Sequence, residues 1–263
     1  QGQQDAGKDP LKGLDRQPAI KAVAQWDNLV WPLDGQPEWR SQRGKLSVTG
    51  TREALQVAGE GLLEGQRVTL DGGLGFPAER IELRGVRAQG AGLKLQLDGV
   101  FGPQLDLTWA VQGDALGAWF PGARGQLQSQ GRLKGPRNRP SGEAQLSARD
   151  FKLGDASAQA LALQVRGGFT PGAPPLEVRM TAHELRYTDN AARDLKLGFT
   201  GGVVFRDGRW RLESATAELK LSGQGLRYGD NVLDAIEAEA QGGLLPGSPP
   251  VTGRIVAQGL HLI

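Results

Sequence analysis

Apolar and polar residues alternate with a period of two along most of the chain. From residue 46 onward an apolar-x-apolar-x-Gly pattern recurs six times, at Leu46/Val48/Gly50, Leu55/Val57/Gly59, Val68/Leu70/Gly72, Ile81/Leu83/Gly85, Leu95/Leu97/Gly99 and Trp109/Val111/Gly113. Residues two positions apart point to the same face of a β-strand, so this pattern predicts an antiparallel meander with one apolar face. The glycines are expected near the strand ends, where they permit tight turns.

A longer repeat runs through the second half of the chain. A seven-residue phrase occurs at residues 147–153, 181–187, 222–228 and 256–262, with offsets of 34, 41 and 34 residues. A period of this size is typical of a supersecondary unit stacked on copies of itself, so the phrase predicts an elongated array. Each unit is expected to hold two long alternating strands. The seven extra residues of the second period are expected to lengthen the strand near residues 217–221.

The two patterns together predict an all-β fold. The expected architecture is an elongated repeat sheet, an antiparallel meander curled into an open trough, with little or no helix. Residues 114–124 allow one short helical turn. Residues 1–18 are interpreted as a flexible lead-in, residues 19–135 as the first part of the trough, and residues 136–263 as its continuation, ending inside a fourth repeat.

A one-faced apolar sheet has to cover that face, because each leucine-sized side chain left in water forgoes about 1.5–3 kcal/mol. The sheet can pack on itself as a filled solenoid or sandwich, close into a barrel, or curl into a trough whose lining holds something else. Small residues in the third unit, Ala238 and Ala240, leave space and favour the trough. The residues expected to line it are Leu83, Leu95, Leu97, Val111, Leu161, Leu163, Val165, Leu176, Val178, Leu195, Leu197, Phe199, Trp210, Leu212, Ile236 and Ile255.

Composition narrows the functional classes. The 263 residues include 40 Gly and 15 Pro without a Gly-X-Y period, which indicates a turn-rich β protein rather than collagen. Cysteine is absent, which excludes disulfides and thiolate metal sites. The net charge is +2 and no basic run occurs, so nucleic-acid binding is not expected. No stretch approaches the length of a membrane-spanning helix.

Catalytic chemistry has little support in the sequence. The two histidines, His183 and His261, occupy non-equivalent positions of the phrase and lack a nearby nucleophile motif. Asp155, Asp189 and Asp230 recur at equivalent positions and allow an acidic ladder for calcium or sugar hydrolysis, as in a β-solenoid enzyme or adhesin. Their contexts are turn sequences, and turn chemistry alone explains the recurrence. We expect no catalytic residue, no metal site and no cofactor, and therefore not an enzyme.

Four features of the chain occur together: the segment Trp26-Asp-Asn-Leu-Val-Trp-Pro-Leu33, the spaced sheet glycines after it, Phe120-Pro-Gly122 leading into residues 125–136, and the repeats beyond. In these features the chain resembles the TamB family, within the AsmA-like group of bridge-like lipid-transfer proteins of Gram-negative bacteria. The resemblance covers roughly residues 20–263 and indicates a middle, periplasmic fragment.

The resemblance implies a fold and a function. Proteins of this family are anchored in the inner membrane, cross the periplasm, and meet an outer-membrane barrel, TamA, through a part that this fragment is not expected to include. Their sheet curls into a taco-like trough, implying a segment that conducts phospholipid between the membranes and supports outer-membrane biogenesis. The alternative is a scaffold that chaperones outer-membrane proteins, autotransporters among them, by pairing with their strands at a sheet edge.

Overall fold

The computed structural model describes residues 19–31, 39–168, 170, 173–206, 209–212, 214, 216–243, 245 and 247–261. The side chains of Trp31, Trp39, residues 204–210 and Leu212 also lie outside the description. Over the described residues the chain is almost entirely β-strand, with one short 3₁₀ turn, η1, at Leu116–Ala118. This turn lies within residues 114–124, the segment whose sequence allows a short helical turn.

The strands follow one another as a meander. They are β1 (Ile20–Trp31), β2 (Trp39–Thr51), β3 (Ala54–Leu63), β4 (Gln66–Gly75), β5 (Ile81–Gly90), β6 (Leu93–Phe101), β7 (Gln104–Gly113), β8 (Arg124–Pro136), β9 (Ser141–Leu153), β10 (Ala156–Gly168), β11 (Leu176–Tyr187), β12 (Asn190–Gly201), β13 (Val203–Arg206), β14 (Arg209–Leu212), β15 (Ala217–Tyr228), β16 (Asn231–Gly242) and β17 (Thr252–His261).

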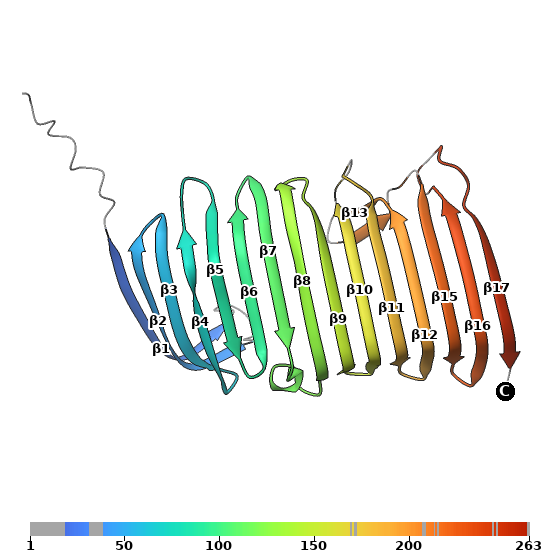
Figure 1. Ribbon diagram of the computed structural model, residues 1–263, viewed down its shortest axis with the longest axis horizontal. Coiled ribbons are helices and arrows are strands. Elements are labelled where there is room, and N and C mark those ends of the chain that lie inside the picture. The colour runs from blue at the N-terminus through green and yellow to red at the C-terminus, as the bar shows by residue number, and fades with distance from the viewer. Residues whose placement is uncertain are drawn as a thin grey trace, which may run out of the picture.

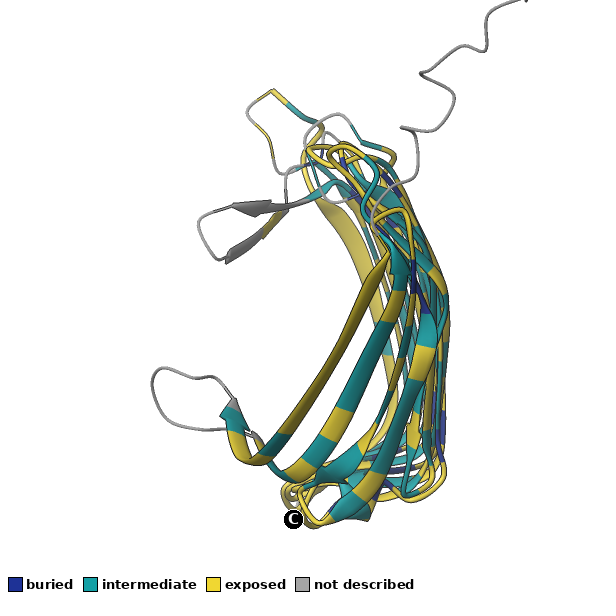
Figure 2. Ribbon diagram, turned by 90° about the vertical axis from the view of Figure 1, so that its left-hand side faces the viewer, coloured by how far each residue is buried: buried dark blue, intermediate teal, exposed yellow. Residues whose placement is uncertain are grey.

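Fifteen of these strands form one open antiparallel sheet in chain order, with β12 pairing directly with β15 (Figure 1). The strands arch along their length, so the sheet is curled (Figure 2). Strands in the sheet make their main contacts with their sheet neighbours, and η1 with β8. The expected all-β, open, curled meander is confirmed.

Alanine side chains show which face lies inside the curl. Curling a sheet brings side chains together on the inner face and spreads them on the outer face. On the apolar face Ala148 is 3% exposed and Ala182 is 6% exposed. On the polar face Ala110, Ala160 and Ala162 are exposed. The apolar face is therefore the inner one.

Several glycines of the triplet pattern lie inside strands rather than at strand ends, which corrects the sequence-based expectation. A Cβ on Gly59 would lie 3.0 Å from Leu46 Cδ1, and one on Gly72 would lie 2.6 Å from Val86 Cα. Gly85 has a φ of 57° within β5, where the register with β6 shifts. Close packing and a β-bulge, not turns, account for these three glycines.

The seven-residue insertion of the second repeat also differs from its expected position. It belongs to the connection between β12 and β15, where β13 and β14 form a separate two-stranded sheet. β15, at 12 residues, is as long as β11, so residues 217–221 are not lengthened. Trp210 and Leu212, expected on a returning strand of the trough, lie instead in β14, because β15 provides the returning strand that pairs with β12.

The repeated phrase marks a crease across the sheet. Its fourth residue has a positive φ in every copy: 47° at Asp150, 49° at Glu184, 57° at Gly225 and 65° at Gly259. A left-handed residue interrupts the alternation, so the second and fifth residues of each phrase share the inner face. Backbone kinks of this kind add curvature to a sheet, and the crease accounts for the recurrence of the phrase.

Candidate functional site: an apolar floor on the inner face

The inner face carries continuous rows of apolar residues that cross all fifteen strands. In register, the central row runs from β1 to β17. Its residues are Ala24, Leu46, Gly59, Leu70, Ala88, Leu95, Val111, Ser129, Leu146, Leu163, Met180, Leu197, Leu221, Ala238 and Ile255.

Two further rows flank the central row. The upper row consists of Ala22, Val48, Val57, Gly72, Val86, Leu97, Trp109, Gly131, Ala144, Val165, Val178, Phe199, Leu219, Ala240 and Gly253. The lower row consists of Trp26, Gly44, Gly61, Val68, Gly90, Leu93, Gly113, Leu127, Ala148, Leu161, Ala182, Leu195, Gly223, Ile236 and Ala257. We call these three rows the apolar floor.

The apolar floor contains no charged side chain and a single hydroxyl, that of Ser129. The Ser129 Oγ accepts a hydrogen bond from the indole Nε1 of Trp109 at 3.4 Å, and the Trp109 ring lies over Gly131. The indole Nε1 of Trp26 likewise donates a hydrogen bond to the Oγ of Ser41 at 2.8 Å. Both indole N–H groups of the floor thus have hydrogen-bond partners. The floor therefore presents neither a charge nor an unsatisfied indole donor.

Fourteen of the residues expected to line a trough share this inner face. Twelve belong to the apolar floor, and Leu83 and Leu176 lie one row above it, where Leu83 pairs with Leu74 and Leu176 pairs with Gly201. The remaining two, Trp210 and Leu212, are in β14. Whether lipid occupies the face stays a prediction.

The described chain has no second layer packed on the apolar floor. No large side chain among the described residues is less than 2% exposed, and Leu95 and Ile255 are 37% and 73% exposed. A filled solenoid or sandwich would bury such residues to native packing density. At ~4.8 Å per strand the uncovered floor is about 67 Å long.

Charged side chains lie on the outer face instead. Arg132 donates two hydrogen bonds to Asp106, from Nε at 2.9 Å and from Nη2 at 2.8 Å. These hydrogen bonds lower the pKa of the Asp106 carboxyl below its ordinary value. The hydrogen bond from His183, 2.9 Å away, lowers the pKa of Asp194. The pairs hold the polar face together across neighbouring strands.

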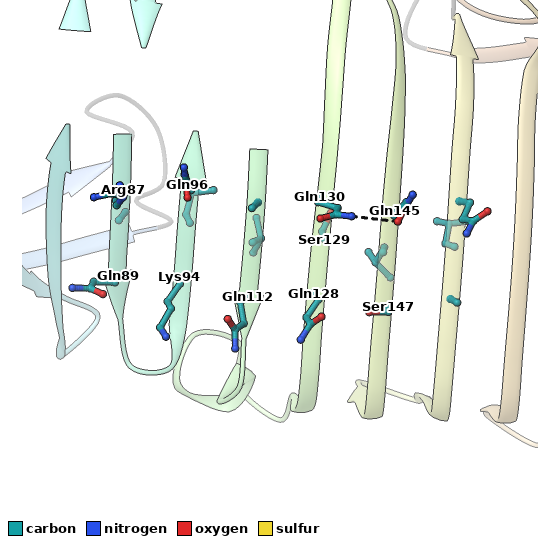
Figure 3. A pocket seen from close by; sticks show the side chains of 18 residues that line it. Arg87, Gln89, Lys94, Gln96, Gln112, Gln128, Ser129, Gln130, Gln145 and Ser147 are labelled. Carbon is teal, nitrogen blue, oxygen red and sulfur yellow. Dashed lines mark hydrogen bonds between the residues drawn. The ribbon is translucent and has the colours of Figure 1, made fainter. Parts of the chain in front are cut away.

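The outer face also carries a shallow hollow of about 630 Å³ (Figure 3). Neutral amides dominate it, including Gln96, Gln128, Gln130 and Gln145, and the amide of Gln130 donates to Gln145 Oε1 at 3.3 Å. It lies between side chains that project from a single sheet. Its amides offer neither a nucleophile nor a general base.

The acidic ladder does not form a metal site. Asp155, Asp189 and Asp230 each occupy the second position of a two-residue turn between antiparallel strands. Among the described residues no group of three or more His, Cys, Asp or Glu side chains is placed to hold a metal ion. His183 is on the outer face beside Asp194, and His261 lies 3.8 Å from Asp234.

Sequence reasoning missed two features of the inner face. One is the crease, whose signal was present: glycine at the fourth position in two copies of the phrase indicates a positive φ. The other is the tyrosine pair, Tyr187 and Tyr228, at the seventh position of the second and third copies. Both are exposed, at 61% and 77%, at the end of a strand.

An open, single-layered repeat sheet with an uncharged apolar inner face defines a class of elongated all-β repeat proteins. Residues 53–227 match the family model described as TamB, N-terminal domain, and the chain belongs to the TamB family. The match is to the N-terminal domain, whereas the sequence alone suggested a middle segment. No curated protein and no solved structure gives a match. In the described part of the chain no helix is long and apolar enough to cross a membrane.

Proposed function

We propose that this chain is a periplasmic segment whose apolar floor conducts phospholipid between the inner and outer membranes, without catalysing a reaction. The observation that carries the proposal is the floor itself: three rows across fifteen strands with one hydroxyl and no charge. The polar side-chain groups that an acyl chain would meet on it are the Ser129 hydroxyl and the two hydrogen-bonded indole N–H groups of Trp26 and Trp109. Membership of the TamB family supports the periplasmic setting and a contribution to outer-membrane biogenesis.

The energetics favour an apolar occupant. Many floor side chains remain partly exposed, and covering each leucine completely is worth up to about 1.5–3 kcal/mol. An acyl chain supplies this cover without specific hydrogen bonds. Phospholipid head groups would stay in water at the open rim of the curl. In the whole protein the outer-membrane barrel TamA is the partner we propose, through a part outside this chain.

The first test is lipid extraction and mass spectrometry of the purified chain. We expect bound phospholipid, and uptake of fluorescent phospholipid by the delipidated protein. A chain that carries none and takes up none contradicts the proposal.

A matched pair of variants separates the two faces. Leu197→Arg puts a charge on the floor, and Gly198→Arg puts the same charge on the outer face, where a Cβ meets only Lys220 Cβ at 3.9 Å. We expect Leu197→Arg to lose most lipid transfer while its circular dichroism is unchanged, and Gly198→Arg to behave as wild type. If Leu197→Arg unfolds the chain, Leu197 belongs to a packed core.

The alternative of a scaffold that pairs with outer-membrane strands at its edge stays a prediction. Cross-linking to unfolded barrel strands in the absence of bound lipid would favour it.

A further inference from the structure

Three hairpin turns stand side by side at the rim below the crease. They are Gly154-Asp155, Thr188-Asp189 and Gly229-Asp230, and the first residue of each has a positive φ of 57°, 53° and 57°. The strand before the second turn ends in Arg186-Tyr187, and the strand before the third ends in Arg227-Tyr228. These are the only two tyrosines of the sequence.

An apolar hollow of about 440 Å³ lies between the two tyrosines. Leu185, Leu226 and Leu233 line it together with Tyr187 and Tyr228. Ala192 pairs with both Leu185 and Leu226 and is 6% exposed, so its short side chain forms the bottom of the hollow. Leu195 of the apolar floor also borders it, which makes the hollow continuous with the floor.

The polar groups at the mouth of the hollow follow a fixed order along the chain. Leu226 and Tyr228 border the hollow, Arg227 between them lies on the outer face, and Asp230 stands in the turn beyond. Tyrosine suits a boundary between apolar material and water, since its ring is apolar and its hydroxyl is a hydrogen-bonding group. A carboxylate in the adjoining turn matches an ammonium group.

We propose that this rim hollow holds one glycerophospholipid with an ammonium-bearing head group. Its acyl chains occupy the hollow, its ester region lies at Tyr187 and Tyr228, and its ammonium group binds Asp230 or Asp189. The inference rests on the proposed function and adds which rim the head groups follow and which head group is preferred.

Tyrosine nitration tests whether bound lipid occupies the rim hollow. Delipidated protein and protein loaded with phosphatidylethanolamine are treated with tetranitromethane, and nitration of each tyrosine is followed by mass spectrometry. We expect loading to slow nitration of Tyr187 and Tyr228 several-fold. Unchanged nitration in protein that demonstrably carries lipid overturns the rim hollow and leaves the proposed function intact. Absence of any bound lipid overturns both.

Head-group preference tests the chemistry. Uptake is compared from vesicles that contain either phosphatidylethanolamine or phosphatidylglycerol as the labelled lipid. We expect about a threefold preference for the ethanolamine lipid, the size typical of an exposed ion pair, and its disappearance in the double variant Asp189→Asn, Asp230→Asn. Asp155→Asn is the matched control, because its turn follows Lys152-Leu153 and lacks the tyrosine. Equal uptake by the wild type, or loss of the preference in Asp155→Asn, contradicts the assignment.

Discussion

Backbone conformation at single residues shapes the inner face. Glycine adopts a positive φ without a Cβ penalty, and two copies of the repeated phrase place glycine at the crease, Gly225 and Gly259. The other two place Asp150 and Glu184 there, and a non-glycine residue in the left-handed region costs about 1–2 kcal/mol. The recurrence of the crease despite this cost indicates that curvature at this level of the sheet is required.

Glu184→Gly should therefore stabilise the chain. Relief of the left-handed strain outweighs the added entropy of the unfolded glycine, and we expect a gain of about 0.5–1 kcal/mol in the free energy of unfolding, measured by chemical denaturation. Gly85→Ala is the converse control. Gly85 has a φ of 57°, and no atom lies within 4 Å of an added Cβ. The variant should therefore lose about 1 kcal/mol in the free energy of unfolding through backbone strain alone. A destabilised Glu184→Gly would contradict the strain argument.

Arg132 controls the titration of Asp106 on the outer face. Its hydrogen bonds lower the pKa of that carboxyl, so the stabilisation is present above the pKa of the unfolded aspartate and is lost as the pH falls through the lower folded pKa. In Arg132→Gln we expect the pKa of Asp106, measured by carboxyl NMR, to rise toward its ordinary value, and the acid-dependent loss of stability to shrink. Arg166 lies on the same face, two strands from Arg132. The variant Arg166→Gln should therefore leave the pKa of Asp106 unchanged.

At the scale of elements, the period-two pattern was enough to predict strands and their inner face. All six apolar-x-apolar-x-Gly triplets fall within strands β2 to β7, because alternation is imposed by the extended backbone itself. The position of the insertion was not predictable in this way. Residues 209–212 and residues 217–221 both alternate, and only pairing with β12 decides which segment belongs to the main sheet. The site was predictable to the same extent: the face of Leu163 or Leu197 follows from alternation, whereas the rim hollow depends on Ala192 standing between two leucines.

The β13–β14 hairpin should be dispensable for folding of the main sheet. β12 and β15 pair from Ala191 with Arg227 to Thr200 with Glu218 without any contribution from the hairpin. Replacing residues 202–216 with the shorter connection of the preceding repeat, residues 169–175, should keep the circular dichroism spectrum. We expect the melting temperature to change by no more than about 2–4 °C, because loop closure depends weakly on length. Loss of cooperative unfolding would show that the hairpin is integral to the sheet.

At the scale of the whole molecule, the chain behaves as a one-dimensional array. The main contacts of each strand in the sheet are with its sheet neighbours, so stability is carried by successive strand interfaces rather than by a central core. The apolar floor is also built strand by strand, since each added strand contributes one residue to each row. Length of sheet and length of floor therefore change together.

Deleting one whole repeat, residues 147–180, should give a folded chain with a shorter floor. The deletion joins Leu146 to Thr181, so the second copy of the phrase takes the place of the first. On β8, Leu127 then meets Ala182 instead of Ala148, and Gln128 meets Thr181 instead of Ser147, which are equivalent contacts.

The deleted chain loses two strands, so small-angle X-ray scattering should show a maximum dimension shorter by about 10 Å, and bound lipid should fall roughly in proportion to length. The control removes one residue more, residues 147–181, which joins Leu146 to Ala182. Every residue after the junction is then shifted by one position, so on β8 Gln128 meets Ala182 and Leu127 meets His183. The apolar face of the strands after the junction is therefore turned outward. We expect that variant to aggregate; equal folding of both deletions would contradict a sheet built from interchangeable repeats.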